Sequence, residues 1–323
     1  MVLGGSGLFF GASWAAEKYF KIERTGQAFY ILGSVFLFLT ILAAGYFGLL
    51  GPEFILKGEN RYRVLLAGSI ATEIALFSKI RRFHNKVYTQ ACLWGMTVSM
   101  CFLMGALKLE WPDCMNGMMY YSFLLIGGNE VYRRKSGLQG SMNAPADRFI
   151  DEFMGEFGLF AALQFWIISG MMAYKAVAGG IGFIIGILFL GIWEVTFWDT
   201  LAFGLMAAGT ALVALRRRSP EMKMLHSLTM MIFFQYAGFC IPVDFTYQVF
   251  FGAAMTAVWF LAERRFKNPL NNLAGGCVFS AVLAIDMAVL LLDMLFSRDS
   301  LGNQLAASAV VILLAAVMAE WGR

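Results

Sequence analysis

Residues 26–51 read GQAFYILGSVFLFLTILAAGYFGLLG and contain no charged side chain. A helix needs about 20 residues, each rising ~1.5 Å, to cross the hydrocarbon core of a bilayer. The segment is long enough for one crossing, and Gly51-Pro52 is a natural place for the helix to end. It therefore predicts a transmembrane helix.

Further apolar runs follow along the chain. They are 1–16, Tyr62–Ser78, Tyr88–Leu107, Cys114–Tyr132, 157–175, 178–193, 199–215, His226–Val243, Phe245–Ala262, Leu270–Phe296 and Leu301–Ala319. Hydrophobic residues make up 59% of the chain and charged residues 14%, against about 45–50% and about 25% in a soluble domain. The sequence predicts an all-α fold, a polytopic transmembrane bundle of about 10–12 spans in hairpins, in a single integral-membrane domain.

Arginine clusters stand where these runs stop. They are Arg81-Arg82, Arg133-Arg134, Arg216–Arg218 and Arg264-Arg265. Basic residues gather in the cytoplasmic loops of membrane proteins, where they also meet anionic lipid. We therefore expect the loops at Arg81, Arg133, Arg216 and Arg264 to be cytoplasmic. Since membrane spans separate the clusters, no continuous basic face forms, and nucleic acid is not expected as a partner.

The segment between Arg148 and Leu215 is harder to interpret, because three crossings would put one basic loop on the wrong side. Either the glycine-rich run 178–193 is re-entrant or strongly tilted, or one basic loop lies on the non-cytoplasmic side despite the usual preference of basic loops for the cytoplasm. We favour three helices, one of them unusual. The preceding segment Pro145–Phe157 has the pattern of an amphipathic helix at the membrane interface. Asp199 follows an aromatic turn and is also predicted to be interfacial.

The two halves of the chain share a local pattern. Ala67–Asn85 ends in IRRFHN and Gly252–Asn268 ends in ERRFKN. An internal repeat over residues 26–135 and 199–320 would explain this, as in many transporters. The alternative is convergence, because any bundle of hairpins places arginine pairs at its cytoplasmic ends.

The runs FYILGSVFLFLTILAAGYFGLLG and ENRYRVLLAGSIATEIALF resemble multi-spanning bacterial membrane proteins that are classed as domains of unknown function. In those proteins, too, successive hairpins carry small residues and polar turns. The resemblance covers about the first third of the chain. It implies a bacterial inner-membrane protein and supplies no activity and no site residues.

Polar residues inside the predicted spans are the candidates for a functional site. They are Glu73, Gln164, Gln235, Asp286 and Asp293. A charge near the bilayer centre costs about 2.5–3.5 kcal/mol on insertion scales, which invites a functional interpretation. Burial favours the neutral form of a carboxyl group, so Glu73, Asp286 and Asp293 could exchange protons or bind a cation. The alternative for each residue is a hydrogen bond between neighbouring helices.

Motifs for known chemistries are absent from the sequence. There is no G-x-x-x-x-G-K-[ST], no H-E-x-x-H and no G-x-S-x-G. The chain has two histidines, and its five cysteines show no C-x-x-C spacing. We therefore expect no cofactor and no bound metal.

Three functions remain open. The first is a secondary transporter or permease for a small solute, proton-coupled through buried carboxyl groups. The second is a non-catalytic membrane subunit or scaffold with a protein partner. The third is an enzyme acting on lipid or lipid-linked glycan, using interfacial acids such as Glu110 or Asp113. The number of spans, the possible repeat, the buried carboxyl groups and the glycine-rich run favour transport, which is the leading expectation. The short loops and the missing motifs favour a scaffold, and the missing motifs argue against an enzyme.

Overall fold

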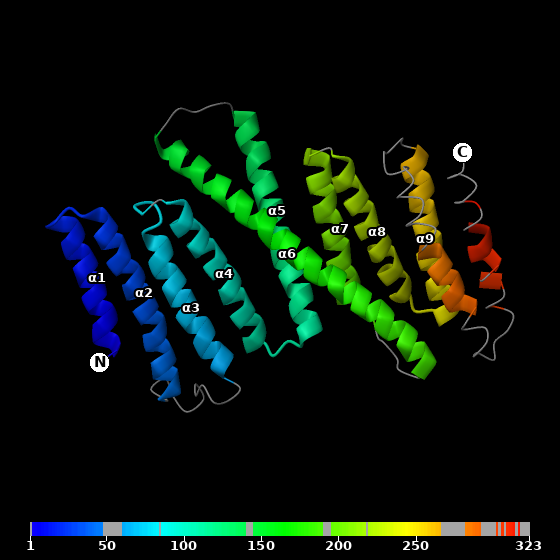
Figure 1. The fold of residues 1–323 in the computed structure, drawn as a ribbon, viewed down its shortest axis with the longest axis horizontal. Coiled ribbons are helices and arrows are strands. Elements are labelled where there is room, and N and C mark those ends of the chain that lie inside the picture. Colours follow the sequence, from blue (N-terminus) through cyan, green and yellow to red (C-terminus); the bar gives the residue numbers. More distant parts are fainter. Residues whose placement is uncertain are drawn as a thin grey trace. The chain divides into compact units, whose positions relative to one another are not determined.

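The regular structure of the described residues is entirely helical (Figure 1). In the computed structural model the described residues are 2–47, 60–83, 85–139, 145–189, 195–217, 219–265, 282–291, 302, 305–306, 308–313 and 316. The helices are α1 (Val2–Lys18), α2 (Glu23–Tyr46), α3 (Arg61–Ser78), α4 (Lys86–Ala106), α5 (Trp111–Gln139), α6 (Pro145–Phe189), α7 (Phe197–Arg217), α8 (Pro220–Phe239) and α9 (Phe245–Arg265), followed by Val282–Leu291. The predicted all-α fold class is confirmed.

The chain forms two compact units. Unit 1 comprises Met1–Met118 and Leu124–Gln164, and unit 2 comprises Met119–Phe123 and Phe165–Arg323. In unit 1, α1 packs on α2, α2 on α3, and α3 on α4; in unit 2, α8 packs on both α7 and α9. Packing between helices that follow each other in sequence agrees with the expected hairpins. The internal repeat stays a prediction.

Five of the described helical segments are long and apolar enough to cross a membrane. They are Glu23–Tyr46, Lys86–Ala106, Phe149–Gly179, Phe197–Arg217 and Phe245–Ala262. Large apolar side chains on these segments are exposed, among them Val35, Val98, Leu159 and Val258. A lipid environment accounts for such exposure, and the chain is an integral membrane protein. The number of crossings stays a prediction, because most of Leu270–Phe296 and Leu301–Ala319 lies outside the described residues.

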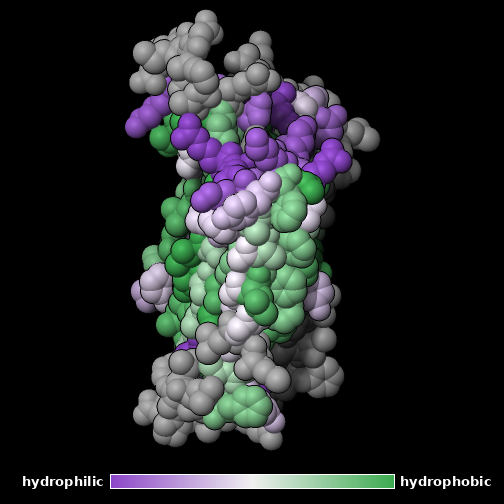
Figure 2. Space-filling model, turned by 90° about the vertical axis from the view of Figure 1, so that its left-hand side faces the viewer, coloured by the Kyte–Doolittle hydropathy of each residue, from purple (hydrophilic) through white to green (hydrophobic). Residues whose placement is uncertain are grey.

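The end of unit 1 at which α1 joins α2 and α3 joins α4 is rich in basic residues, whereas the opposite helix ends carry Arg61, Arg63, Lys108, Glu110 and Asp113. Figure 2 shows hydrophilic residues at the first of these ends and a hydrophobic band along the helices. The connections 17–24 and 79–86 together hold seven Lys or Arg residues and two Glu residues. Arg82 Nη2 lies 2.8 Å from Glu17 Oε2, so an ion pair joins the two connections. This separation of charge from the apolar band is expected where helix ends reach a membrane surface.

One prediction for the middle of the chain is wrong. α6 is continuous from Pro145 to Phe189, so 157–175 and 178–193 are not separate helices. The amphipathic segment Pro145–Phe157 is likewise helical but joins its span without a break. The sequence 146–189 contains no proline, and a glycine costs a helix only about 1 kcal/mol, which does not end it. At 1.5 Å per residue, 45 residues extend roughly 68 Å, about twice the hydrocarbon thickness.

Helices α8 and α9 approach each other closely at two glycines. A Cβ atom at Gly238 would lie 2.6 Å from the carbonyl oxygen of Gln248 and 2.9 Å from the nitrogen of Gly252. Both are backbone atoms of α9, which cannot move aside as a flexible side chain can. Small residues that allow backbones to approach are typical of helix packing in membranes. The hairpin turn predicted around Pro242–Asp244 is confirmed, because α8 ends at Phe239 and α9 begins at Phe245.

Substituting Gly238 by alanine tests this contact. We expect Gly238→Ala to lower the free energy of unfolding by about 1–3 kcal/mol, because the added methyl group must push α9 away. Gly170→Ala is the matched control, since a Cβ atom there meets nothing within 4 Å. Thermal unfolding of the purified protein in detergent measures both. Equal melting temperatures for the two variants would contradict the close approach.

Candidate functional site

A cavity of about 700 Å³ lies within unit 2. Its wall is formed by parts of α6, α7, α8, α9 and Val282–Leu291, and it follows α8 from Leu225 to Phe239. That stretch of helix is about 21 Å long. Most lining residues are aliphatic or aromatic; those with polar groups are Ser169, Thr210, Thr229, Gln235, Tyr236, Asp286 and Trp166. A cavity of this size with a few polar groups is typical of small-molecule sites.

Asp286 is the acidic residue among those that line the cavity. It is only 6% exposed. Gln235 Nε2 donates a hydrogen bond of 3.0 Å to Asp286 Oδ2. Among the described residues, no Lys or Arg pairs with Asp286, and no donor is found for its Oδ1. The carboxyl group therefore meets the apolar cavity with one neutral donor as its protein partner.

The orientation of Gln235 follows from its other hydrogen bond. Thr256 Oγ1 donates to the carbonyl oxygen of Gly252 at 2.8 Å, so towards Gln235 it can only accept. Gln235 Nε2 lies 3.3 Å from this oxygen and donates to it. Both amide hydrogens are thus committed, one to Thr256 and one to Asp286. A Cβ atom at Gly252 would lie 2.8 Å from Gln235 Oε1, so the glycine leaves room for the amide.

A second polar group lies nearer the start of α8 and is satisfied locally. The hydroxyls of Thr210 and Thr229 lie 2.7 Å apart, and each also lies within 2.8 Å of a backbone carbonyl in its own helix. His226 Nδ1 is 3.1 Å from the carbonyl oxygen of Ala207, which makes this nitrogen the donor. Such bonds are the usual solution for hydroxyls inside membrane helices. This group therefore differs from Asp286, which keeps an oxygen without a described donor.

A buried ion pair connects α6 and α7 beside one end of the cavity. Lys175 Nζ pairs with Asp199 Oδ1, and each side chain is 12% exposed. The Thr196 hydroxyl and backbone nitrogen donate to Asp199 Oδ2 at 2.8 and 3.0 Å, while the Asp199 nitrogen donates to Thr196 Oγ1 at 3.2 Å. These reciprocal bonds form a capping box at the start of α7. The interfacial setting of Asp199 stays a prediction; within the protein its side chain is largely buried against Lys175.

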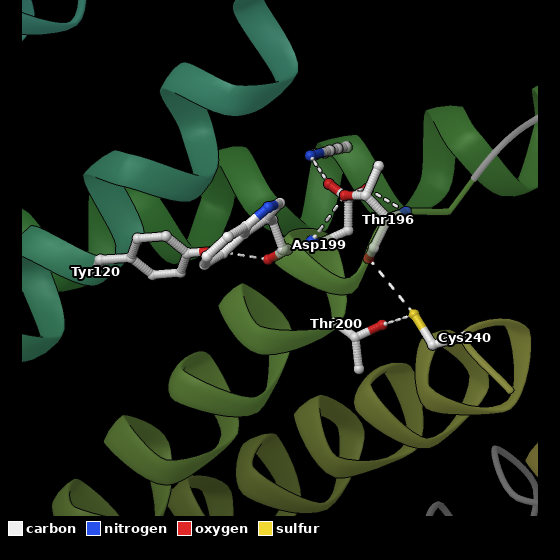
Figure 3. A network of polar contacts seen from close by, with 7 residues as sticks. Tyr120, Thr196, Asp199, Thr200 and Cys240 are labelled. Atoms are coloured by element: carbon white, nitrogen blue, oxygen red, sulfur yellow. Dashed lines mark hydrogen bonds and ion pairs between the residues drawn. The ribbon is translucent and has the colours of Figure 1, made fainter. Parts of the chain in front are cut away.

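The first turn of α7 makes further polar contacts, which Figure 3 shows around Asp199. Thr200 Oγ1 donates to the carbonyl oxygen of Tyr236 at 3.1 Å and lies 2.8 Å from Cys240 Sγ. Tyr120 donates its hydroxyl hydrogen to the carbonyl oxygen of Trp198 at 2.8 Å. These bonds link the start of α7 to α5 and to the end of α8. They hold this end of the cavity in place.

Two other candidate residues belong to unit 1. Glu73 lies on α3 with its carboxyl group against Gly95 of α4, where a methyl group would overlap it. Its Oε2 is buried without a hydrogen-bond partner among the described residues. Gln164 is 1% exposed, and its Oε1 accepts from Thr97 Oγ1 at 3.4 Å.

The structure brings Gln235 and Asp286 together, while Glu73 and Gln164 belong to the other unit. Asp293 lies outside the described residues, so the carboxylate trio of Glu73, Asp286 and Asp293 stays a prediction. Reasoning from the sequence missed the roles of Lys175, Thr256 and Gly252. One signal was present: T-F-W-D at 196–199 has the spacing of a capping box. A lysine within an apolar helix was another, because it needs a partner.

Comparison with known proteins finds no matching family model, no similar curated protein and no similar solved structure. Among the described residues, no group of three or more His, Cys, Asp or Glu side chains could hold a metal ion. The resemblance to bacterial membrane proteins stays a prediction. The case for a function therefore rests on the geometry of the cavity and its carboxyl group.

Breaking the Lys175–Asp199 pair should destabilise the protein. Asp199→Asn or Lys175→Met alone leaves one buried charge unpaired, at an expected cost of about 3–5 kcal/mol. The double variant should lose less than the sum of the two single changes, because no unpaired charge remains. Denaturant unfolding of the purified protein measures these differences.

The exposed pair Arg134–Glu130 supplies the control for this experiment. Its side chains are 68% and 26% exposed, and the residues are one helical turn apart. We expect Arg134→Met to cost at most about 0.5 kcal/mol. Additive losses at Lys175 and Asp199 would show that the buried pair is not coupled.

Proposed function

We propose that this membrane protein is a secondary transporter or permease for a small solute, and that the cavity of unit 2 binds the solute. The observation that carries the proposal is the cavity of about 700 Å³ with Asp286 on its wall. A volume of this size can enclose a small organic molecule. Because the carboxyl group of Asp286 lies within apolar walls, its state of protonation can depend on whether a solute is bound.

Coupling to protons follows from the surroundings of Asp286. An ionised carboxylate in apolar surroundings is costly unless a proton or a cation balances it. Gln235 donates one neutral hydrogen bond, which does not supply that charge. Protonation of Asp286 and occupancy of the cavity should therefore depend on each other, as a proton-coupled carrier requires.

The two alternatives find less support in the described residues. A scaffold needs packed helices and a surface for its partner. A cavity of this size within the helices contributes neither to packing nor to such a surface. An enzyme acting on lipid or lipid-linked glycan would need paired acids and a basic clamp for phosphate. Among the described residues, the cavity wall holds Asp286 and no Lys or Arg. Transport remains the function that the geometry favours.

Membrane and sidedness belong to the same proposal. We place the protein in a bacterial inner membrane with the loops at Arg81, Arg133, Arg216 and Arg264 in the cytoplasm, facing anionic lipid. The gathering of basic residues at one end of unit 1 supports this for the Arg81 loop. At the other loops the support is the basic residues in the sequence.

Proton uptake by the purified protein in liposomes tests the proposal. After a pH step we expect wild-type protein to take up protons and Asp286→Asn to lose this uptake, because the amide cannot titrate. Asp244→Asn makes the same chemical change in the exposed α8–α9 turn and should leave uptake intact. Glu73→Gln tests separately whether the carboxyl group of unit 1 contributes.

The decisive comparison is between the two aspartate variants. Equal uptake by wild type, Asp286→Asn and Asp244→Asn would remove Asp286 from the mechanism. Absence of uptake in the wild type would remove proton coupling altogether. The melting temperature of each variant shows whether a lost signal reflects chemistry or unfolding.

A further inference from the structure

We propose that the cavity of unit 2 binds a lipophilic organic cation, whose positive charge is balanced by the carboxylate of Asp286. The inference rests on the proposed function for its biological role and names the class of solute. It depends on three properties of the described residues: the charge at Asp286, the apolar wall and the orientation of Gln235.

Charge is the first property. Asp286 lines the cavity and is 6% exposed, and no Lys or Arg among the residues that the structure describes pairs with it. Lys175 pairs with Asp199, and Arg216 and Arg217 are exposed at the end of α7. A buried carboxylate without a protein cation needs its counter-charge from a proton or from a bound molecule. A ligand with one positive charge would supply it.

The wall of the cavity is the second property. Aliphatic side chains, two methionines and the rings of Trp166, Tyr236 and Phe239 line most of it. Inorganic cations such as Mg²⁺ and Ca²⁺ need several oxygen ligands, which this wall does not offer. Large apolar groups gain free energy by leaving water for such a wall, and aromatic faces attract organic cations. The ligand should therefore combine a delocalised charge with a large apolar surface.

The orientation of Gln235 is the third property. Its amide hydrogens are committed to Thr256 and to Oδ2 of Asp286. This fixes Oδ2 as an acceptor and leaves Oδ1, for which no donor is described, as the oxygen that can face a ligand. The carboxylate carries one negative charge and can therefore balance one positive charge. A proton and a monovalent organic cation would thus compete for the same group.

The test is equilibrium binding of tetraphenylphosphonium to the purified protein in a non-ionic detergent. Its charge is permanent, so its own protonation does not complicate the result. Triphenylphosphine oxide, a neutral compound with similar rings, serves as the second probe. We expect wild-type protein to bind the cation. Asp286→Asn should bind it at least about tenfold more weakly, because the amide carries no negative charge to balance the cation. Binding of the neutral probe should change little.

Two further variants control for folding and for the site. Asp286→Glu keeps the charge and should bind the cation more tightly than Asp286→Asn. Asp244→Asn makes the same aspartate-to-asparagine change at an exposed position and should bind like wild type. If Asp286→Asn does not fold, the comparison of cation with neutral probe in wild type decides, because a charged site prefers the cation.

Several results would overturn the inference. They are no binding of the cation to wild type, equal affinity in Asp286→Asn, and no preference over the neutral probe, which would indicate a site for an uncharged apolar molecule. Cation binding without transport in liposomes would leave the inference standing and remove the proposed function. Proton uptake by Asp286 without cation binding would overturn the inference and leave the proposed function standing.

Discussion

Polar groups inside a membrane protein must find their partners within the protein, because lipid chains offer none. Several of the described hydroxyls meet this constraint locally: Thr40 and Thr72, for example, donate to carbonyls one helical turn earlier. Asp199 meets it with a capping box and a lysine. Asp286 meets it only in part, because one of its oxygens has no described donor. Glu73 Oε2 likewise has no partner among the described residues, so incomplete satisfaction alone does not mark a site. Asp286 differs because it also lines a cavity.

The candidate site depends on how closely its helices pack. Gly238 allows the backbones of α8 and α9 to approach, and Gly252 leaves space for the side chain of Gln235. The amide can then reach both Thr256 and Asp286, which lie on different helices. Small residues thus have two effects in unit 2: they stabilise the helix pair and they position a donor beside the carboxyl group.

The helical fold could be predicted because the length of an apolar run is a local property of the sequence. The error at α6 came from treating glycines as breaks, although without proline they lower helix stability only slightly. Asp286 and Gln235 could be selected as polar residues within apolar runs. Their contact could not, because it depends on Thr256 and Gly252 of a third helix. The pairing of Asp199 with Lys175 could not be predicted for a similar reason, since the two residues are 24 apart in the sequence.

The space at Gly252 has a consequence for how this sequence can vary. A larger residue at this position would collide with the amide of Gln235, and a shorter residue at position 235 could not reach Asp286. Neither position can therefore change freely while the other stays as it is. In related chains that keep the acidic residue, we expect glycine at position 252 and glutamine at position 235 to be inherited together and to covary when either is lost.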